Sequence, residues 1–190
     1  MRLFVAIDIG EDARAAIAAA QRRIGRALGD DRSLRWIDPE QLHLTLVFLG
    51  EIPAPRVVDI AAAVARPIDT VQPFRAVFGG VGVFPDRGAP RVLWLGLVAG
   101  VRETQALQQI VSDRLEPLGV AREPRPFHPH LTIGRWRDRH PDHRRRLAAL
   151  TAPGGIASCD VAHLTLYESR LSSSGPVYTA VVHAALTRSG

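Results

Sequence analysis

Apolar side chains recur along the chain with the periods of strands and helices. Residues 2–9 are almost wholly apolar, which is typical of a buried strand. Residues 11–29 carry apolar side chains at helical spacing and end at a glycine, so they predict an amphipathic helix. The predicted apolar face of this helix consists of Ala16, Ala19, Ala20, Ile24 and Leu28.

The rest of the chain predicts strands and helices of ordinary length, separated by proline and glycine. The central elements are a turn at 38–40, a strand at 42–49, a helix at 53–65, a hairpin of 73–84 with 91–98, and a helix at 101–118. The later elements are a strand at 129–137, a short basic helix at 141–150 and two closing strands at 160–168 and 177–186. The order strand, helix, hairpin thus recurs weakly. Turns between neighbouring strands are too short for parallel crossovers, which favours an α+β fold over a doubly wound parallel sheet.

The composition of the chain bears on its binding partner and on its cellular compartment. The net charge is +5, and all 24 basic residues are arginine, which is consistent either with codon bias or with an anionic partner. The single cysteine, Cys159, excludes an intrachain disulfide. The apolar N-terminus reaches Asp8 too soon for a signal peptide, and no apolar run is long enough to span a bilayer. We therefore expect a cytoplasmic protein.

Two predicted strands contain nearly the same tetrapeptide, His43-Leu44-Thr45-Leu46 and His130-Leu131-Thr132-Ile133. Residues i and i+2 of a strand face the same side, so each copy presents a histidine beside a threonine. Across a cleft, one neutral imidazole could take a proton from an attacking oxygen while an imidazolium protonates the leaving oxygen. The threonine hydroxyls could donate to non-bridging phosphate oxygens. The pattern favours phosphodiester chemistry.

These motifs and their flanks resemble the 2H phosphoesterase superfamily, and most closely its RNA 2′,3′-cyclic phosphodiesterases, also called 2′-5′ RNA ligases. The resemblance covers nearly the whole chain. It rests on an opening strand at 2–7, two histidine motifs at 42–50 and 125–135, a middle strand at 91–96 and a closing hairpin at 166–178.

The resemblance implies one domain, residues 1–190, of two pseudo-symmetric lobes: a bilobal α+β fold with two antiparallel β-sheets and outer helices around a central groove. It implies hydrolysis of RNA 2′,3′-cyclic phosphate ends to 2′-phosphomonoesters. In that reaction His43 is the proton donor to the leaving 3′ oxygen, and His130 is the proton acceptor that activates water. Thr45 and Thr132 would bind the phosphate. No cofactor, metal, membrane or second subunit is expected.

Arg135 is a further phosphate-binding candidate by the same resemblance. Strict alternation points its side chain away from His130 and Thr132, so it reaches the site only if the strand bulges, which Gly134 permits. Trp36, Trp94 and Trp136 are expected to pack in the core or at the rim, and Trp136 is the best candidate among them for a base-stacking platform, because alternation puts it in phase with His130. The arginines between Arg137 and Arg146 are either a solvated helix face or a track for RNA phosphates.

Other histidines leave alternatives open. His128 and His130 could form a metal pair, but no nearby cysteine or carboxylate has matching spacing, and His140 and His143 are expected to be solvated. A third copy of the tetrapeptide, His163-Leu164-Thr165-Leu166, lacks the flanks of the other two, so we predict that His163 is a surface or strand-edge residue. Two further functions remain: ATP-independent 2′-5′ ligation by the reverse chemistry, and a non-catalytic nucleotide- or RNA-binding module.

Overall fold

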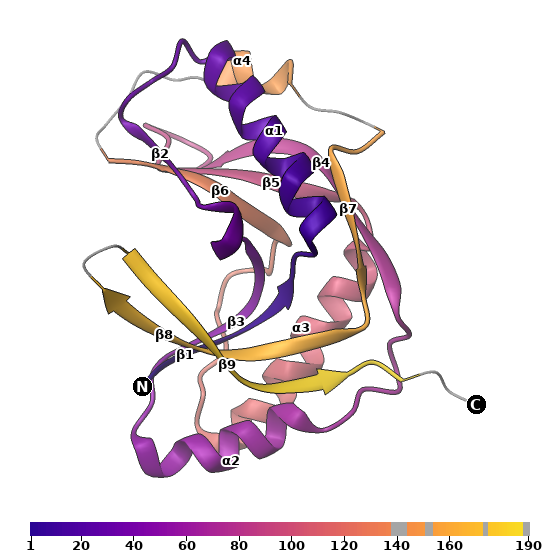
Figure 1. Cartoon of the computed structure of the whole chain (residues 1–190). Coiled ribbons are helices and arrows are strands. Elements are labelled where there is room, and N and C mark those ends of the chain that lie inside the picture. Colours follow the sequence, from indigo (N-terminus) through magenta and orange to yellow (C-terminus); the bar gives the residue numbers. More distant parts are fainter. Residues whose placement is uncertain (138–143, 151–153, 173–174, 188–190) are drawn as a thin grey trace.

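The strands form two antiparallel sheets in the computed structural model, which describes residues 1–137, 144–150, 154–172 and 175–187 (Figure 1). The first sheet has the strand order β3-β1-β8-β9 and the second has the order β2-β6-β5-β4-β7. Neighbouring strands within both sheets are antiparallel, which confirms the predicted α+β class. The strands are β1 Arg2–Asp8, β2 Leu34–Trp36, β3 His43–Glu51, β4 Phe74–Phe84, β5 Val92–Ala99, β6 His130–Trp136, β7 Ala157–Val161, β8 His163–Ser172 and β9 Gly175–Ala185.

The helices pack beside the two sheets. Helices α2 (Ala54–Ala65) and α3 (Val101–Leu115) pack beside the four-stranded sheet, whereas α1 (Glu11–Ala27) and α4 (Arg144–Ala148) lie beside the five-stranded sheet (Figure 1). Short 3₁₀ turns at Pro39–Gln41 and Glu116–Leu118 complete the regular structure. Within the described residues, no helix combines the length and apolar character needed to cross a bilayer.

Strands β3 and β6 obey the predicted alternation in two different sheets. Leu44, Leu46 and Leu131 are buried in the core, while the histidines and threonines between them are only partly buried. Since β3 belongs to the first sheet and β6 to the second, the polar faces of both sheets are available to one site.

Three sequence expectations were wrong in detail. The predicted strand at 160–168 is two strands, because the chain passes from one sheet to the other at Ala162. The run contains no glycine or proline to mark this step. Strand β2 was not predicted, since three residues carry too little periodicity. In α1, Ile17 is buried and Ala19 is exposed, because alanines occur on several faces and do not distinguish the buried one.

Close packing between β4 and β5 explains why residue 82 is a glycine. Gly82 lies opposite Trp94 in the ladder, and a Cβ added at Gly82 would meet the indole ring at 2.2 Å. The indole is rigid, so such a Cβ would force the ring or the strand to move. Gly80, on the same strand, has no atom within 4 Å of the equivalent position.

We therefore expect Gly82→Ala to lower the free energy of unfolding by about 1–3 kcal/mol, the usual cost of overpacking. Gly80→Ala is the matched control, and we expect its effect to stay within about 0.5 kcal/mol. Urea unfolding of both variants measures the difference. Equal destabilisation would show that the indole does not occupy the space above Gly82.

Candidate active site

The five residues predicted to form the site line one cavity of about 1200 Å³. His43 and Thr45 reach it from β3, and His130, Thr132 and Arg135 reach it from β6. Residues nearly half the chain apart in sequence are thus brought to opposite walls of one space. This cavity is the central groove that the resemblance implied.

A backbone carbonyl two residues earlier holds each of the two histidines. The Nδ1 of His43 lies 2.8 Å from the carbonyl oxygen of Gln41, and the Nδ1 of His130 lies 2.8 Å from that of His128. A carbonyl oxygen only accepts, so Nδ1 carries the proton in both rings. In each ring, Nε2 is left as the nitrogen that can exchange a proton.

Aromatic rings enclose both imidazoles. The ring of His43 lies 4.8 Å from that of Phe4 and 5.0 Å from that of Tyr178, and the ring of His130 lies 5.0 Å from that of Phe84. Burial disfavours a charged imidazolium, and it lowers the pKa of both His43 and His130 below 6.5.

Fixed charges act on the two histidines differently. After burial, the Asp8 carboxylate opposes the fall in the pKa of His43, because it favours the imidazolium. At His130 the neighbouring charges, His128 and Arg135, lower the pKa further. Arg135 also lowers the pKa of His43. A carboxylate therefore favours a proton on His43, whereas the Arg135 guanidinium disfavours one on His130.

The bulge that Arg135 requires is present in β6. Leu93 pairs with Gly134 and Trp94 pairs with Thr132, so Ile133 has no partner on β5. The extra residue shifts the alternation by one position. Arg135 consequently lines the groove on the same side as Thr132.

The same bulge confirms core packing for Trp136 and removes the argument for it as a base-stacking platform. Its side chain is buried rather than in phase with His130, and its indole Nε1–H donates to Asp31 Oδ2 at 3.0 Å. Trp136 is a core residue, and strict alternation failed because one residue was inserted in the ladder.

A family model for the 2′-5′ RNA ligase superfamily matches residues 8–173. The chain belongs to this superfamily. It is 33% identical to the RNA 2′,3′-cyclic phosphodiesterase of Archaeoglobus fulgidus over 178 residues, covering 94% of this chain and 96% of the relative. It is 35% identical to the protein of the same name from Thermus thermophilus over 187 residues, covering 95% and 88%. Its fold matches the crystal structure of TT0787 of Thermus thermophilus with a TM-score of 0.77 at 30% identity, over the full length of both chains.

This member of the 2′-5′ RNA ligase superfamily surrounds its histidines with arginines that the sequence motifs did not indicate. Besides Arg135, the groove is lined by Arg2, Arg22, Arg26 and Arg35, against the acidic Asp30 and Asp38. Arg35 lies opposite Arg135 in the β2–β6 pairing. These arginines are scattered along the N-terminal part of the sequence, so no local cluster announced them.

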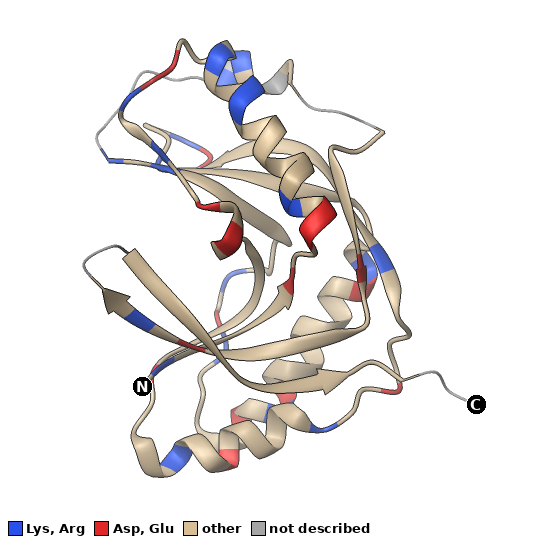
Figure 2. Ribbon diagram, viewed as in Figure 1, with Lys and Arg blue, Asp and Glu red and all other residues tan. Residues whose placement is uncertain are grey.

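The described part of the basic stretch, Arg137 and α4, does not line the groove. Arg144 donates to the carbonyl oxygens of Gly88 and Pro85, at the turn between β4 and β5, and the helix lies at the top of the molecule (Figure 2). Of the described residues from 137 to 146, none lines the groove. Arg139, His140 and His143 lie outside the described residues.

A second cavity, of about 1020 Å³, adjoins the groove and shares Thr45, Phe48 and His130 with it. Its other walls include the apolar side chains of Phe84, Trp94, Leu115, Val120 and Phe127. The same lining also includes Arg91, Arg122 and Arg125, so His130 can be approached from two sides that both carry arginines and aromatic rings.

The third tetrapeptide does not contribute to either cavity. His163 is exposed at the start of β8, and its Nε2 lies 3.1 Å from Asp8 Oδ2. The surface position predicted for it is confirmed, although β8 lies inside its sheet rather than at an edge. His128 and His130 are not in the group of three or more metal-type ligands that the described residues form.

The placement of Arg135 makes a testable prediction about the histidines. Because its positive charge lowers the pKa of both His43 and His130, Arg135→Gln is expected to raise both values. Arg137→Gln is the matched control, since Arg137 is exposed and does not line the groove. NMR titration of the imidazole carbons measures all three proteins. If Arg135→Gln left both pKa values unchanged, the guanidinium would not face the groove.

Proposed function

We propose that the chain hydrolyses RNA 2′,3′-cyclic phosphate ends to 2′-phosphomonoesters, using two histidines and no metal. The observation that carries the proposal is the arrangement of His43 and His130 on opposite walls of one arginine-lined groove, each with Nε2 left to exchange a proton. Curated relatives that share about a third of the sequence are named for this reaction.

In the proposed reaction His130 is the base. Its neutral Nε2 takes a proton from water as the water oxygen attacks phosphorus. Burial and the positive charge of Arg135 disfavour an imidazolium at this position, so the ring is kept neutral until it accepts that proton. The new P–O bond forms on the side opposite the 3′ oxygen.

His43 is the acid. Its Nε2–H protonates the 3′ oxygen as the P–O3′ bond breaks, leaving a 3′-hydroxyl and a 2′-phosphate. The nearby Asp8 carboxylate favours the protonated ring, and a bound phosphate would favour it further. Proton uptake at His130 and release at His43 balance, so the next turnover needs only a proton exchange with water.

Thr45, Thr132 and Arg135 would hold the phosphate. Hydroxyl donors on both walls and one guanidinium suit the non-bridging oxygens, where negative charge develops. The remaining groove arginines are suited to the RNA backbone, which they would bind without reading sequence. We propose that the chain is one domain of two pseudo-symmetric lobes and acts as a monomer. Its proposed location is the cytoplasm, where it would encounter RNA with cyclic phosphate ends.

The second cavity favours 2′-5′ ligation as a second candidate. If a 5′-hydroxyl took the place of water, its strand could reach the phosphate from the side of His130 that lines this cavity. The same two histidines would then exchange protons in the reverse direction. A purely binding role is less favoured, because it gives no reason for two imidazoles with matched carbonyl bonds.

Loss of either histidine is expected to remove catalysis. His43→Ala and His130→Ala should each reduce kcat by about 10²–10⁴-fold, and the double variant should be little worse than either, because one concerted step needs both groups. His163→Ala, which alters an identical tetrapeptide outside the groove, should change kcat by less than about tenfold. The assay is turnover of an oligonucleotide with a 2′,3′-cyclic phosphate, with the product phosphate located by mass spectrometry and enzymatic digestion. Near-normal kcat in either groove variant would overturn the mechanism.

The pH dependence is set by the same two groups. Activity needs one neutral and one protonated imidazole, so kcat/KM should follow a bell-shaped profile. Burial lowers the pKa of both histidines, so the maximum should lie below pH 6.5. The profile of kcat/KM against pH for a cyclic mononucleotide measures it, and a single-limbed rise toward alkaline pH would contradict the two-histidine scheme.

Treatment with EDTA should leave kcat unchanged, and a loss of activity that a divalent ion restores would argue for metal catalysis.

A further inference from the structure

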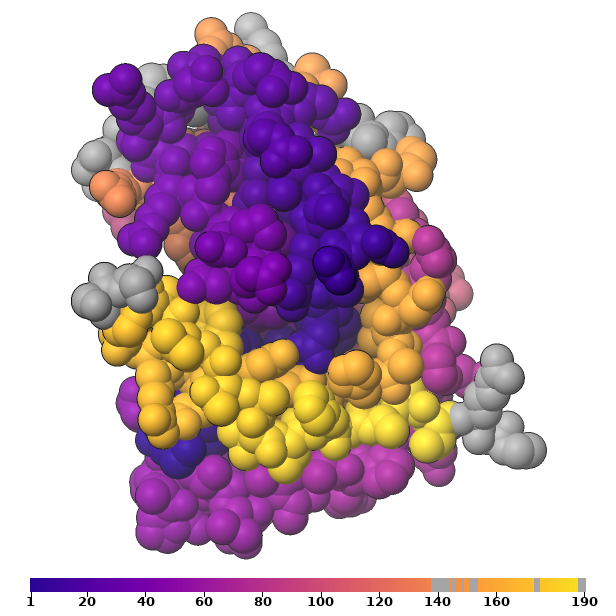
Figure 3. All heavy atoms as spheres, viewed as in Figure 1, coloured from indigo at the N-terminus to yellow at the C-terminus, as the bar shows by residue number. Residues whose placement is uncertain are grey.

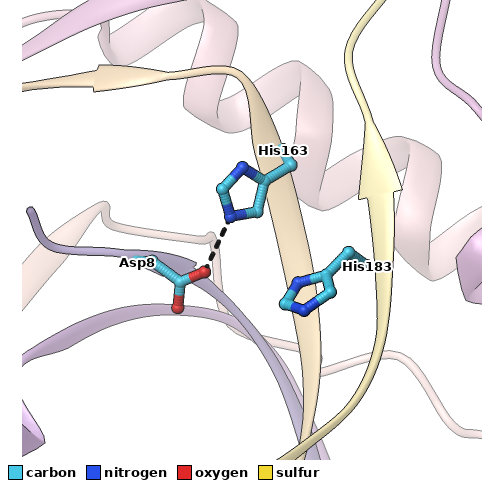
Figure 4. Close-up of side chains that lie close together, drawn as sticks. All are labelled: Asp8, His163 and His183. Carbon is cyan, nitrogen blue, oxygen red and sulfur yellow. Dashed lines mark hydrogen bonds and ion pairs between the residues drawn. The ribbon is translucent and has the colours of Figure 1, made fainter.

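The third tetrapeptide lies in a polar cluster at one end of the four-stranded sheet. Asp8 ends β1, His163 begins β8 and His183 lies near the end of β9, so three adjacent strands contribute one side chain each (Figure 4). The space-filling view shows N-terminal residues (indigo) and the C-terminal strands (orange to yellow) meeting on one face of the molecule (Figure 3).

Hydrogen bonds orient the members of this cluster. Asp8 Oδ2 accepts from His163 Nε2 at 3.1 Å and from the hydroxyl of Thr165 at 2.7 Å, and the hydroxyl of Tyr167 donates to Asp8 Oδ1. His183 Nδ1 lies 2.8 Å from the Thr165 oxygen. Because the one hydroxyl proton of Thr165 is given to Asp8, His183 Nδ1–H is the donor in that contact. Nε2 of His183 therefore carries a lone pair.

We propose that Asp8, His163 and His183 form a binding site for a divalent cation of the zinc class. Each residue offers a ligand atom, and these atoms all lie within 4.8 Å of one another. Two imidazoles and one carboxylate are ligands that Zn²⁺ prefers, and three protein ligands leave a fourth tetrahedral position for water.

Small side-chain rotations are enough to complete the geometry. Ligands at 2.0–2.1 Å around a tetrahedral Zn²⁺ lie about 3.4 Å apart. His163 Nε2 and Asp8 Oδ2 are already 3.1 Å apart, and the other ligand atoms, now within 4.8 Å of one another, need to approach by about 1.4 Å at most. Both imidazoles are exposed and can turn, while Asp8 is held by its neighbours. On binding, the neutral ring of His163 carries its proton on Nδ1 instead of Nε2, so the Nε2 lone pair faces the cation and no net proton is released.

The surrounding residues fit the outer shell of a metal site. Histidine ligands commonly donate the second ring N–H to an oxygen, and Thr165 supplies that oxygen to His183. Tyr167 holds the carboxylate in a similar way. A single carboxylate provides too few oxygen ligands for Ca²⁺ or Mg²⁺. None of the three ligands lines the groove, so the cation would lie outside the proposed active site.

Isothermal titration of Zn²⁺ into the untagged, EDTA-treated and dialysed full chain tests the site. We expect one equivalent bound, with His163→Ala and His183→Ala each weakening the affinity by at least about tenfold. His128→Ala is the matched control, because it removes a histidine near the groove, and it should bind like the parent. Circular dichroism confirms that the variants are folded.

A second readout is thermal unfolding. A cation that binds only the folded chain raises Tm, and saturating Zn²⁺ should do so for the parent and His128→Ala but not for His163→Ala. No binding at a Zn²⁺ concentration of about 100 μM would overturn the proposal. So would binding that survives both His163→Ala and His183→Ala, or binding that is lost only in His128→Ala. None of these readouts depends on turnover, so they separate this site from the proposed reaction.

Discussion

The alternation of side chains along β3 and β6 is the constraint on which the rest of the structure depends. A strand between a core and a groove must place alternate residues in each. Leu44, Leu46 and Leu131 are essentially removed from solvent, and each burial contributes roughly 1.5–3 kcal/mol. That energy holds each strand in one register, because a slip by a single residue would expose the leucines and bury the histidines. The groove side chains are thus positioned by the core beneath them.

The same burial also determines the acid–base chemistry of the groove. Aromatic neighbours make the two imidazoles poorly solvated, which lowers their pKa values, and the backbone carbonyls of Gln41 and His128 leave Nε2 free in each ring. The two walls differ mainly in charge. Asp8 lies in register with His43 across the β1–β3 pairing, while Arg135 acts on the side of His130. An acid and a base can therefore arise from two nearly identical peptides.

A bulge in β6 and the short strand β2 bring arginines into the groove that strict side-chain alternation would not place there. One unpaired residue, Ile133, turns Arg135 into the groove and Trp136 into the core. The short strand β2 then brings Arg35 opposite Arg135. Both features depend on pairing between distant strands. The sequence pattern could therefore say that Arg135 would face the groove if the strand bulged near Gly134, but not whether the bulge forms.

Much of the fold and the central pair of histidines could be read from the sequence, since strand and helix periods and the flanks of a motif are local properties. The sequence by itself determined the α+β class, most elements, and the presence of a histidine beside a threonine on one face of each of three strands. The flanks of the motifs predicted which two of the three tetrapeptides share a groove, and only the tertiary structure decided where the third one lies. The chain leaves one sheet for the other at Ala162, and this places His163 beside Asp8 and His183 instead of opposite His43. The physical reason is that side-chain alternation is fixed within a strand, whereas a side chain's partners are fixed by long-range pairing and by the burial of the whole core.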